Sequence, residues 1–367
     1  MPLDIPRPSR PVFHGDGAPA VAPDTPGDPV FAPGGRRPQA AVVLSAALRD
    51  EILGDRGRSE LTGLVDVVAD CHDRAELTAH PRRHDVEVLL CSWGAPRLTE
   101  NLLNDMPGLR VVLHAAGSVR ALVTEAVWER GITVVSAADA NNEPVAEYVH
   151  AQTVLALKDV HRRSRRIVTE RALPALDLAP GIRGRTVGLV SFGSVARKTA
   201  DRLRRIGADL LAWDPHQDDE VFGTHGVTRV TELPELVARS MVLSVHTPLV
   251  PGRTEKLIDG ELLRLLPVGA TLINTARGAV IDEGAMLEVL RERPDLFAVL
   301  DVTVEEPPAP ASPLYTLPNV MLTGHVAGTV GSERRALGEL VLGELRRLLA
   351  GQSPCHAVAR SSAHLRA

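Results

Sequence analysis

Cysteine is scarce in this chain, which has only Cys71, Cys91 and Cys355 among its 367 residues. An odd number of cysteines without regular spacing does not match the disulfide framework of a small secreted domain or the ligand set of a zinc site. We therefore expect no bound metal and a reducing environment, which favours a cytoplasmic location.

Long apolar runs and an excess of positive charge are also missing. No run reaches the length that spans a membrane, and the N-terminus lacks the apolar core of a secretory signal. The net charge of −5 comes without a dense basic patch, so we expect neither a membrane nor nucleic acid as a partner. The composition is otherwise ordinary, with 44% apolar and 24% charged residues over a length that favours two domains.

Hydrophobic periodicity is absent at both ends of the chain. Residues 1–38 are rich in proline and glycine and show neither a period of 2 nor one of 3.6. Such a segment cannot bury enough apolar surface to offset its ordering entropy, so we expect a disordered tail, with a docking arm for a partner subunit as the alternative. Residues 353–367 form a second tail, in which Ala357 and Val358 could add a short edge contact.

Between these tails, strand-like apolar runs alternate with helical patterns. This alternation predicts parallel sheets covered by helices on both faces, and hence an α/β fold with two doubly wound parallel-sheet domains. The first unit is expected to end at Pro144, a long helix follows over residues 145–168, and the second unit starts at Arg185. The expected strands are residues 41–44, 65–69, 86–91, 111–113 and 132–135, then 186–190, 209–213, 241–245, 270–273, 297–302 and 320–322.

The last three expected strands each deliver one ionisable side chain at their carboxyl end, namely Arg277, Glu306 and His325. Parallel sheets bind ligands at this edge, so the three side chains can share one crevice. Arginine can clamp a carboxylate through two parallel hydrogen bonds, and a histidine oriented by a carboxylate can move a proton near neutral pH. The set suits proton transfer at a carbonyl group that lies next to a carboxylate.

A dinucleotide-binding fingerprint needs a strand, a glycine turn, a helix N-terminus and an acid about 20 residues later. Here Ser191, Gly193 and Ala196 stand where the motif has small residues, mostly glycine. Gly193 keeps the close approach to a pyrophosphate, while Ser191 brings a side chain into the tight turn. Asp214 would bind the ribose hydroxyls and repel a 2′-phosphate, which favours NAD over NADP; otherwise it is a turn aspartate. The second unit is therefore predicted to be a Rossmann cofactor domain.

Three motifs in this order resemble the NAD-dependent D-2-hydroxyacid dehydrogenases. They are Asn-Thr-Ala-Arg-Gly around Arg277, Asp-Val-x-x-x-Glu-Pro around Glu306, and Thr-x-His-x-Ala-Gly around His325. The resemblance implies hydride transfer between NAD(H) and a 2-hydroxy/2-keto acid, with arginine as carboxylate clamp and histidine as general acid and base. It also implies a homodimer, a flavodoxin-like substrate domain of residues 39–151 and 331–352, and a cofactor domain of residues 152–330.

The resemblance also assigns the surrounding residues. Glu306, rather than Glu305, matches the family's glutamate before proline, and Asp301 is implied to contact the nicotinamide carboxamide, with a strand-end turn residue as the alternative. Arg120 stands where the family commonly has aspartate, and it is either a surface charge or a contact to a second anionic group. The implied cofactor-binding residues are Ser191, Gly193, Ser194, Val195, Ala196, Asp214, His246, Thr247, Pro248, Ala276, Asp301 and Gly328. The implied substrate-binding residues are Gly117, Ser118, Arg277 and His325. Trp93 follows another strand end and is expected in the wall of the substrate pocket, with a position in the core as the alternative.

Two other functions stay open. The same catalytic set can act on phosphite or a phosphonate-type oxyanion; formate fits less well, because that branch has glutamine in place of Glu306. A nucleotide-sensing binding protein of corepressor type shares this fold. The intact catalytic set disfavours such a binding protein, whereas Ser191 and the proline-rich tail favour it.

Overall fold

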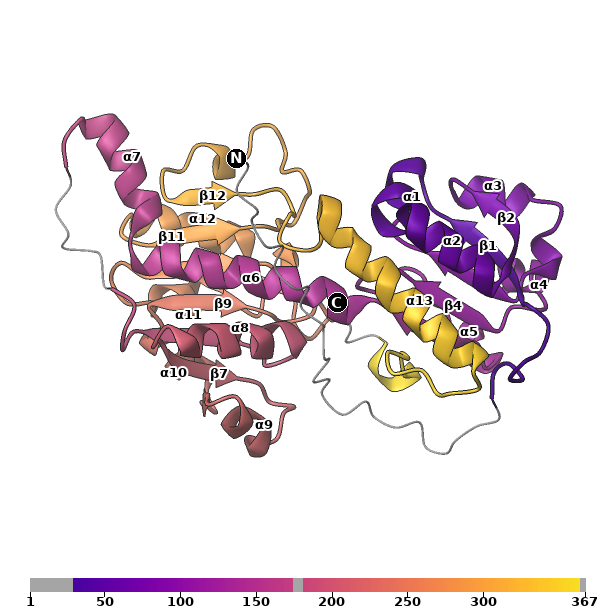
Figure 1. Cartoon of the computed structure of the whole chain (residues 1–367). Helices are drawn as coiled ribbons and strands as arrows, with labels where there is room; N and C mark the ends of the chain where they lie inside the picture. Colours follow the sequence, from indigo (N-terminus) through magenta and orange to yellow (C-terminus); the bar gives the residue numbers. More distant parts are fainter. Residues whose placement is uncertain (1–28, 174–180, 364–367) are drawn as a thin grey trace, which may run out of the picture.

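The computed structural model describes residues 29–173 and 181–363, which form two parallel sheets that lie side by side (Figure 1). The first domain contains a five-stranded sheet of order β2-β1-β3-β4-β5. Its strands are β1 (Gln39–Val43), β2 (Asp66–Cys71), β3 (Val88–Cys91), β4 (Val111–His114) and β5 (Thr133–Ser136). The second domain contains a seven-stranded sheet of order β12-β11-β10-β9-β6-β7-β8, so the predicted α/β architecture is confirmed. Its strands are β6 (Thr186–Val190), β7 (Asp209–Trp213), β8 (Thr228–Arg229), β9 (Val242–Val245), β10 (Thr271–Asn274), β11 (Phe297–Leu300) and β12 (Val320–Leu322).

Helices cover both faces of the first sheet, because its strands are apolar on both sides. One face packs against α1 (Ala46–Ile52), α2 (Gly54–Leu64) and α13 (Arg335–Leu349). The other face packs against α3 (Arg74–Ala79), α4 (Glu100–Asp105) and α5 (Glu125–Glu129). The helix α13 comes from the end of the chain, so the first domain is built from both ends of the described sequence (Figure 1).

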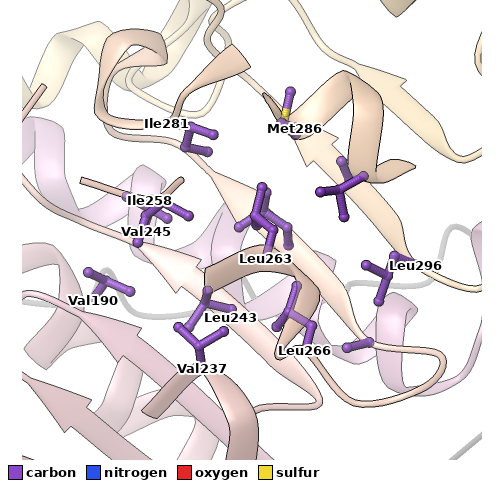
Figure 2. Packing of buried hydrophobic residues seen from close by; sticks show 14 of the residues in the cluster. Val190, Val237, Leu243, Val245, Ile258, Leu263, Leu266, Ile281, Met286 and Leu296 are labelled. Atoms are coloured by element: carbon purple, nitrogen blue, oxygen red, sulfur yellow. The ribbon is translucent and has the colours of Figure 1, made fainter. Parts of the chain in front are cut away.

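The second sheet is likewise covered on both faces. On one face lie α6 (Ala138–Leu157), α8 (Ser194–Arg205) and α9 (Asp219–Thr224). On the other face α10 (Leu233–Arg239), α11 (Gly260–Arg264) and α12 (Glu283–Glu292) enclose an apolar cluster. Figure 2 shows how residues such as Leu243, Leu263 and Met286 fill the space between these helices and the strands. Short 3-10 helices complete the fold: η1 (Arg83–Asp85), η2 (Gly278–Val280), η3 (Pro313–Tyr315), η4 (Gly331–Arg334) and η5 (Arg360–Ser362). In the described part of the chain, no helix is long and apolar enough to cross a membrane.

The helix expected over residues 145–168 is two helices in the structure. The first, α6, begins at Ala138, so the expectation that the first unit ends at Pro144 is wrong, because α6 accommodates this proline in its interior. Asp159 then adopts a left-handed conformation (φ 55°) and separates α6 from α7 (Val160–Glu170). Arg162 stabilises this break, since it pairs with Asp159 and donates to two distant carbonyls of the second domain at 2.7 Å.

The chain crosses between the domains twice, at the start of α6 and after β12. These crossings are joined by Asn141, whose Oδ1 accepts hydrogen bonds from the Thr329 amide (3.1 Å) and hydroxyl (2.9 Å). The helix α6 packs along α8 and across β9 and β10. It also contacts α13, and Ala140 packs against the apolar cluster of the first domain, so α6 lies against both domains. The boundary implied at residue 151 stays a prediction.

Both expected tails contain ordered contacts. Phe31 is buried against the first sheet, and the guanidinium carbon of Arg110 lies 4.8 Å from its ring centre, so the disordered segment expected through residue 38 does not include Phe31. The part of that prediction on residues 1–28 lies outside the described residues. At the other end, Ala357 pairs with Val135 and the Val358 amide donates to the Val134 carbonyl at 2.8 Å, which is the expected edge contact.

Candidate active site

Three neighbouring strands bring the predicted catalytic residues to one edge of the second sheet. Strands β10, β11 and β12 lie side by side and run parallel, so their carboxyl ends meet. Arg277 follows β10, Glu306 lies in the segment after β11, and His325 follows β12. The topology therefore places all three side chains where a parallel sheet binds ligands.

The imidazole of His325 is held by Glu306. The Nδ1 atom of the ring lies 2.7 Å from Glu306 Oε2, and both side chains are partly exposed, at 52% and 41%. Because a carboxylate oxygen accepts hydrogen bonds, Nδ1 carries a proton. The other ring nitrogen, Nε2, is not bound to Glu306 and can exchange a proton with a substrate. The backbone of His325 is left-handed (φ 62°), and its amide donates to the Asp301 carbonyl at 2.6 Å. An exposed histidine oriented in this way can give or take a proton at Nε2.

Asp301 fixes the loop that carries this histidine. Its buried carboxylate accepts hydrogen bonds from the amides of Val326 (2.9 Å) and Ala327 (3.0 Å) and from the hydroxyl of Thr323 (2.6 Å). Three donors on one carboxylate support the interpretation of Asp301 as a strand-end structural residue. Its contact to the nicotinamide carboxamide stays a prediction.

Arg277 presents a partly buried guanidinium beside Glu306. Burial lowers the pKa of Arg277, Arg120 adds to that effect, and Glu306 opposes it. The turn is fixed by Gly278, because a Cβ atom at that position would overlap the backbone of Thr303 and Val304. Gly278 thus sets the turn after Arg277 directly against the segment that leads to Glu306.

The loop after β4 turns its carbonyl groups into the first domain. The Ser92 hydroxyl donates to the Ala115 carbonyl (2.7 Å), and the Ser136 hydroxyl donates to the Gly117 carbonyl (2.6 Å). The His114 Nε2 lies 3.2 Å from the Ser118 carbonyl and must donate to it, because a carbonyl only accepts. Burial lowers the pKa of His114 to about 4, so its ring is neutral at pH 7.

The amides of this loop are consequently available to a ligand. Among the described residues, no hydrogen-bond partner occupies the backbone N–H groups of Ala116, Gly117 and Val119. Unpartnered amides grouped in this way form a nest that can bind an anion such as a carboxylate. Sequence reasoning named Gly117 and Ser118, whose role as substrate contacts stays a prediction, but missed the support from Ser92, His114 and Ser136. Their signal was a polar residue at or just after the end of three apolar strands.

Trp93 lies on the first domain and is 43% exposed. The guanidinium of Arg334 stacks over its ring at 5.4 Å, pairs with Glu51, and donates to the Thr329 carbonyl at 3.3 Å. Trp93 is therefore a surface aromatic held by a crossing segment rather than a core residue. Its role as a substrate contact stays a prediction.

The turn between β6 and α8 fits a dinucleotide pyrophosphate. A Cβ built on Gly193 meets nothing within 4 Å, so the space in front of this turn is open. The helix α8 begins with Gly193 as its N-cap, and no side chain caps it, so its first amides can bind phosphate oxygens. Asp214 directly follows β7, and its carboxylate accepts hydrogen bonds from the backbone amides of Phe192 and His216, both at 2.8 Å. Ser191 is left-handed (φ 70°), in the region that favours glycine.

The segment after β9 carries a histidine without partners. Both ring nitrogens of His246 are buried and unbonded, and burial lowers the pKa of His246 to about 4. Buried polar atoms without partners are costly, so these nitrogens suit contact with a bound molecule. The adjacent Thr247 bonds the Ser191 hydroxyl at 2.9 Å, which links this segment to the glycine turn.

The remaining predicted cofactor residues have various surroundings. Ala196 is fully buried in the contact between α8 and the sheet, and Val195 packs at its edge. Ser194 donates to Asp139 at 3.3 Å, and Gly328 lies against Asn141 at the domain crossing. The Pro248 and Ala276 carbonyls accept hydrogen bonds from Thr254 and Arg277. In the described residues, no group of three or more His, Cys, Asp or Glu side chains could hold a metal.

Known proteins resemble this chain in sequence. The family model for the NAD binding domain of D-isomer specific 2-hydroxyacid dehydrogenases matches residues 150–327. The (S)-sulfolactate dehydrogenase of Chromohalobacter salexigens is 32% identical over 255 residues, which cover 69% of this chain and 82% of that protein. The glyoxylate reductase of Thermofilum pendens is 30% identical over 313 residues, with 83% and 91% covered.

Two further similarities are more limited. The D-3-phosphoglycerate dehydrogenase of Methanocaldococcus jannaschii is 30% identical over 272 residues, but this chain spans about half, 51%, of its length. The apo structure of D-mandelate dehydrogenase from Rhodotorula graminis superimposes with a TM-score of 0.75, covering 89% of this chain and 98% of that one. Its identity is 23%, so this match shows the fold alone.

Proposed function

Because this chain belongs to the D-isomer specific 2-hydroxyacid dehydrogenases, we propose that it transfers a hydride between NAD(H) and a 2-keto or 2-hydroxy acid. The observation that carries the proposal is the 2.7 Å contact between His325 Nδ1 and Glu306 Oε2, beside the guanidinium of Arg277. A proton donor and a carboxylate clamp at one edge of the sheet are what reduction of a 2-keto acid needs.

The second domain supplies the groups that would hold NAD. The first amides of α8 and the open space before Gly193 suit the pyrophosphate, and Asp214 suits the ribose hydroxyls. The unpartnered His246 suits the nicotinamide side. When bound, the reduced nicotinamide supplies the hydride that the carbonyl carbon accepts. A negative charge at Asp214 would repel a 2′-phosphate, so the preference is for NAD over NADP.

The chain's own residues position the acid and move the proton. The amides of Ala116, Gly117 and Val119 and the guanidinium of Arg277 bind the substrate carboxylate, and Arg277 also polarises the keto oxygen. His325, protonated on both ring nitrogens, donates the Nε2 proton to that oxygen and becomes neutral. Its Nδ1 keeps its proton and donates a hydrogen bond to the Glu306 carboxylate, which stabilises the charged ring before the transfer. In the oxidation direction, Nε2 accepts the hydroxyl proton.

The experiment is a spectrophotometric panel of 2-keto acids with NADH. His325→Gln should lower kcat by about 100- to 10,000-fold while the affinity for NADH is kept. Arg277→Lys should raise KM and lower kcat together, because the two-pronged clamp acts in both the ground and the transition state. Glu305→Gln is the matched control for Glu306→Gln, since Glu305 is an exposed neighbour whose carboxylate makes no contact with His325.

Near-normal turnover by the His325 variant, or equal losses in the Glu305 and Glu306 variants, would contradict this mechanism. Absence of NADH oxidation with every acid would favour the nucleotide-sensing binding protein instead. The homodimer, the cytoplasmic location and the lack of a nucleic acid partner stay predictions.

A further inference from the structure

Two arginines, one from each domain, lie near each other where the domains meet, and neither has a carboxylate partner among the described residues. Arg120 ends the loop that carries the amide nest in the first domain, and Arg277 follows β10 in the second. The Arg120 Nη1 atom donates to the Leu249 carbonyl of the second domain, in the segment after β9. Within the described ranges, neither guanidinium lies at ion-pair distance from an Asp or Glu; each bonds only to a backbone carbonyl.

The two positive charges act on each other. Burial lowers the pKa of Arg277, Arg120 lowers it further, and Glu306 is the group that opposes the shift. The Glu306 carboxylate already contacts the His325 ring at 2.7 Å and accepts the Thr303 amide at 3.4 Å. The Glu306 carboxylate is therefore shared by His325 and Arg277, while Arg120 adds a second guanidinium that has no carboxylate partner among the described residues.

The hydrogen bond from Arg120 to the Leu249 carbonyl, which links the domains, does not by itself explain why this residue is charged. A backbone carbonyl can be bound by any neutral N–H donor, and a neutral donor would avoid repulsion with Arg277. The guanidinium has five N–H donors, and the Leu249 carbonyl engages one of its nitrogens. The exposed remainder of the side chain is free to bind an anion that enters the cleft.

We propose that Arg120 selects 2-keto acids that carry a second acidic group, such as a terminal carboxylate, sulfonate or phosphate. The amide nest and Arg277 bind the carboxylate next to the keto group, and Arg120 binds the distal anion through charge-assisted hydrogen bonds. A substrate with a single carboxylate neutralises one of the two guanidinium groups, whereas a substrate with two acidic groups neutralises both. This inference rests on the proposed function and names its substrate class.

Matched pairs of acids test the role of Arg120. The pairs are oxaloacetate and 2-oxobutanoate, 2-oxoglutarate and 2-oxopentanoate, and 3-phosphohydroxypyruvate and hydroxypyruvate. In at least one pair, the wild type should favour the acid with two anionic groups. Arg120→Gln should lower kcat/KM for that acid by about 10- to 100-fold and for its neutral-ended partner by less than about 3-fold.

Two further variants sharpen the comparison. Arg120→Lys keeps the charge but loses the planar fork, so it should retain part of the preference. Arg56→Gln removes an exposed arginine of α2 and should leave kcat/KM unchanged for both acids of a pair. The inference is overturned if the wild type shows no preference in any pair. It is also overturned if Arg120→Gln lowers kcat/KM equally for both acids of a pair, since that result would show that Arg120 only links the two domains.

Equilibrium binding separates this inference from the proposed function. Calorimetric titration with succinate and butanoate, which cannot be reduced, measures the same preference without turnover. If no keto acid is reduced but the wild type binds succinate more tightly than Arg120→Gln does, the proposed function fails and the second anion site stands. If the wild type binds succinate and butanoate equally and shows no preference in turnover, the proposal of a second anion site at Arg120 is wrong.

Discussion

Replacement of Ser191 tests whether the glycine turn is strained. Its φ of 70° lies in the left-handed region, which costs a residue with a Cβ atom about 1–2 kcal/mol. The serine hydroxyl compensates in part, because it lies 2.9 Å from the Thr247 hydroxyl, which in turn donates to the Val190 carbonyl at 3.3 Å. Such a hydrogen bond contributes about 0.5–1.5 kcal/mol.

The two effects separate in two variants. Ser191→Ala keeps the strain and loses the hydrogen bond, so it should destabilise the protein by about 1 kcal/mol. Ser191→Gly also loses the bond but removes the strain, and it increases the entropy of the unfolded chain by about 0.4–1 kcal/mol. We therefore expect the glycine variant to be about 0.5–1 kcal/mol more stable than the alanine variant.

Urea unfolding of the purified variants measures this difference as a shift of midpoint at constant slope. The control is Gly63→Ala in α2, where a built Cβ meets nothing within 4 Å and φ is not positive. There alanine should be more stable than glycine by about 0.5–1 kcal/mol, the reverse of the order at position 191. An alanine variant at 191 that equals or exceeds the glycine variant would show that the left-handed turn carries no cost.

Two further predictions concern the supports of the site. Burial lowers the pKa of His114 to about 4. Between about pH 6.5 and pH 4 the unfolded chain therefore binds a proton at this histidine that the folded protein does not bind. The free energy of unfolding should be highest above about pH 6.5 and fall by about 3 kcal/mol towards pH 4. His114→Asn, whose amide can still donate to the Ser118 carbonyl, should make the free energy of unfolding depend less on pH, as measured by urea titrations at pH 7, 6 and 5. A pH dependence equal to that of the wild type would contradict this prediction. Gly278→Ala should destabilise the protein by about 1–3 kcal/mol and lower kcat, because its Cβ would displace the Thr303–Val304 backbone ahead of Glu306. Full activity and stability in that variant would show that the segment yields without cost.

The strands of both domains could be predicted because each is a short apolar run bounded by polar or turn residues. The edge strand β8 (Thr228–Arg229) was missed, since two residues without an apolar run carry no periodic signal. The break at Asp159 was also missed. The helical pattern continues through it, and the contacts that stabilise it come from carbonyls more than 100 residues away in sequence, at Gly269 and Asp295.

The candidate site was predictable in its composition but not in its supports. Strand order alone brings Arg277, Glu306 and His325 to one edge, because their strands are sheet neighbours. The left-handed backbone of His325 could not be read from its residue type. The three donors that bind the Asp301 carboxylate were equally hidden, because backbone amides are present at every position and only the fold selects which ones converge.

The contacts between the domains explain why Arg120 can exchange partners. The buried residues of each of the four apolar clusters come from one domain, and among the described residues only Ala140, at the start of α6, packs from this helix against the first-domain cluster. The domains instead meet through polar contacts, such as Asn141 with Thr329 and Arg120 with the Leu249 carbonyl. Interfaces of this kind allow relative domain motion. An entering anion would therefore replace one neutral hydrogen bond of Arg120 with a stronger charge-assisted one, and the apolar cores would remain unchanged.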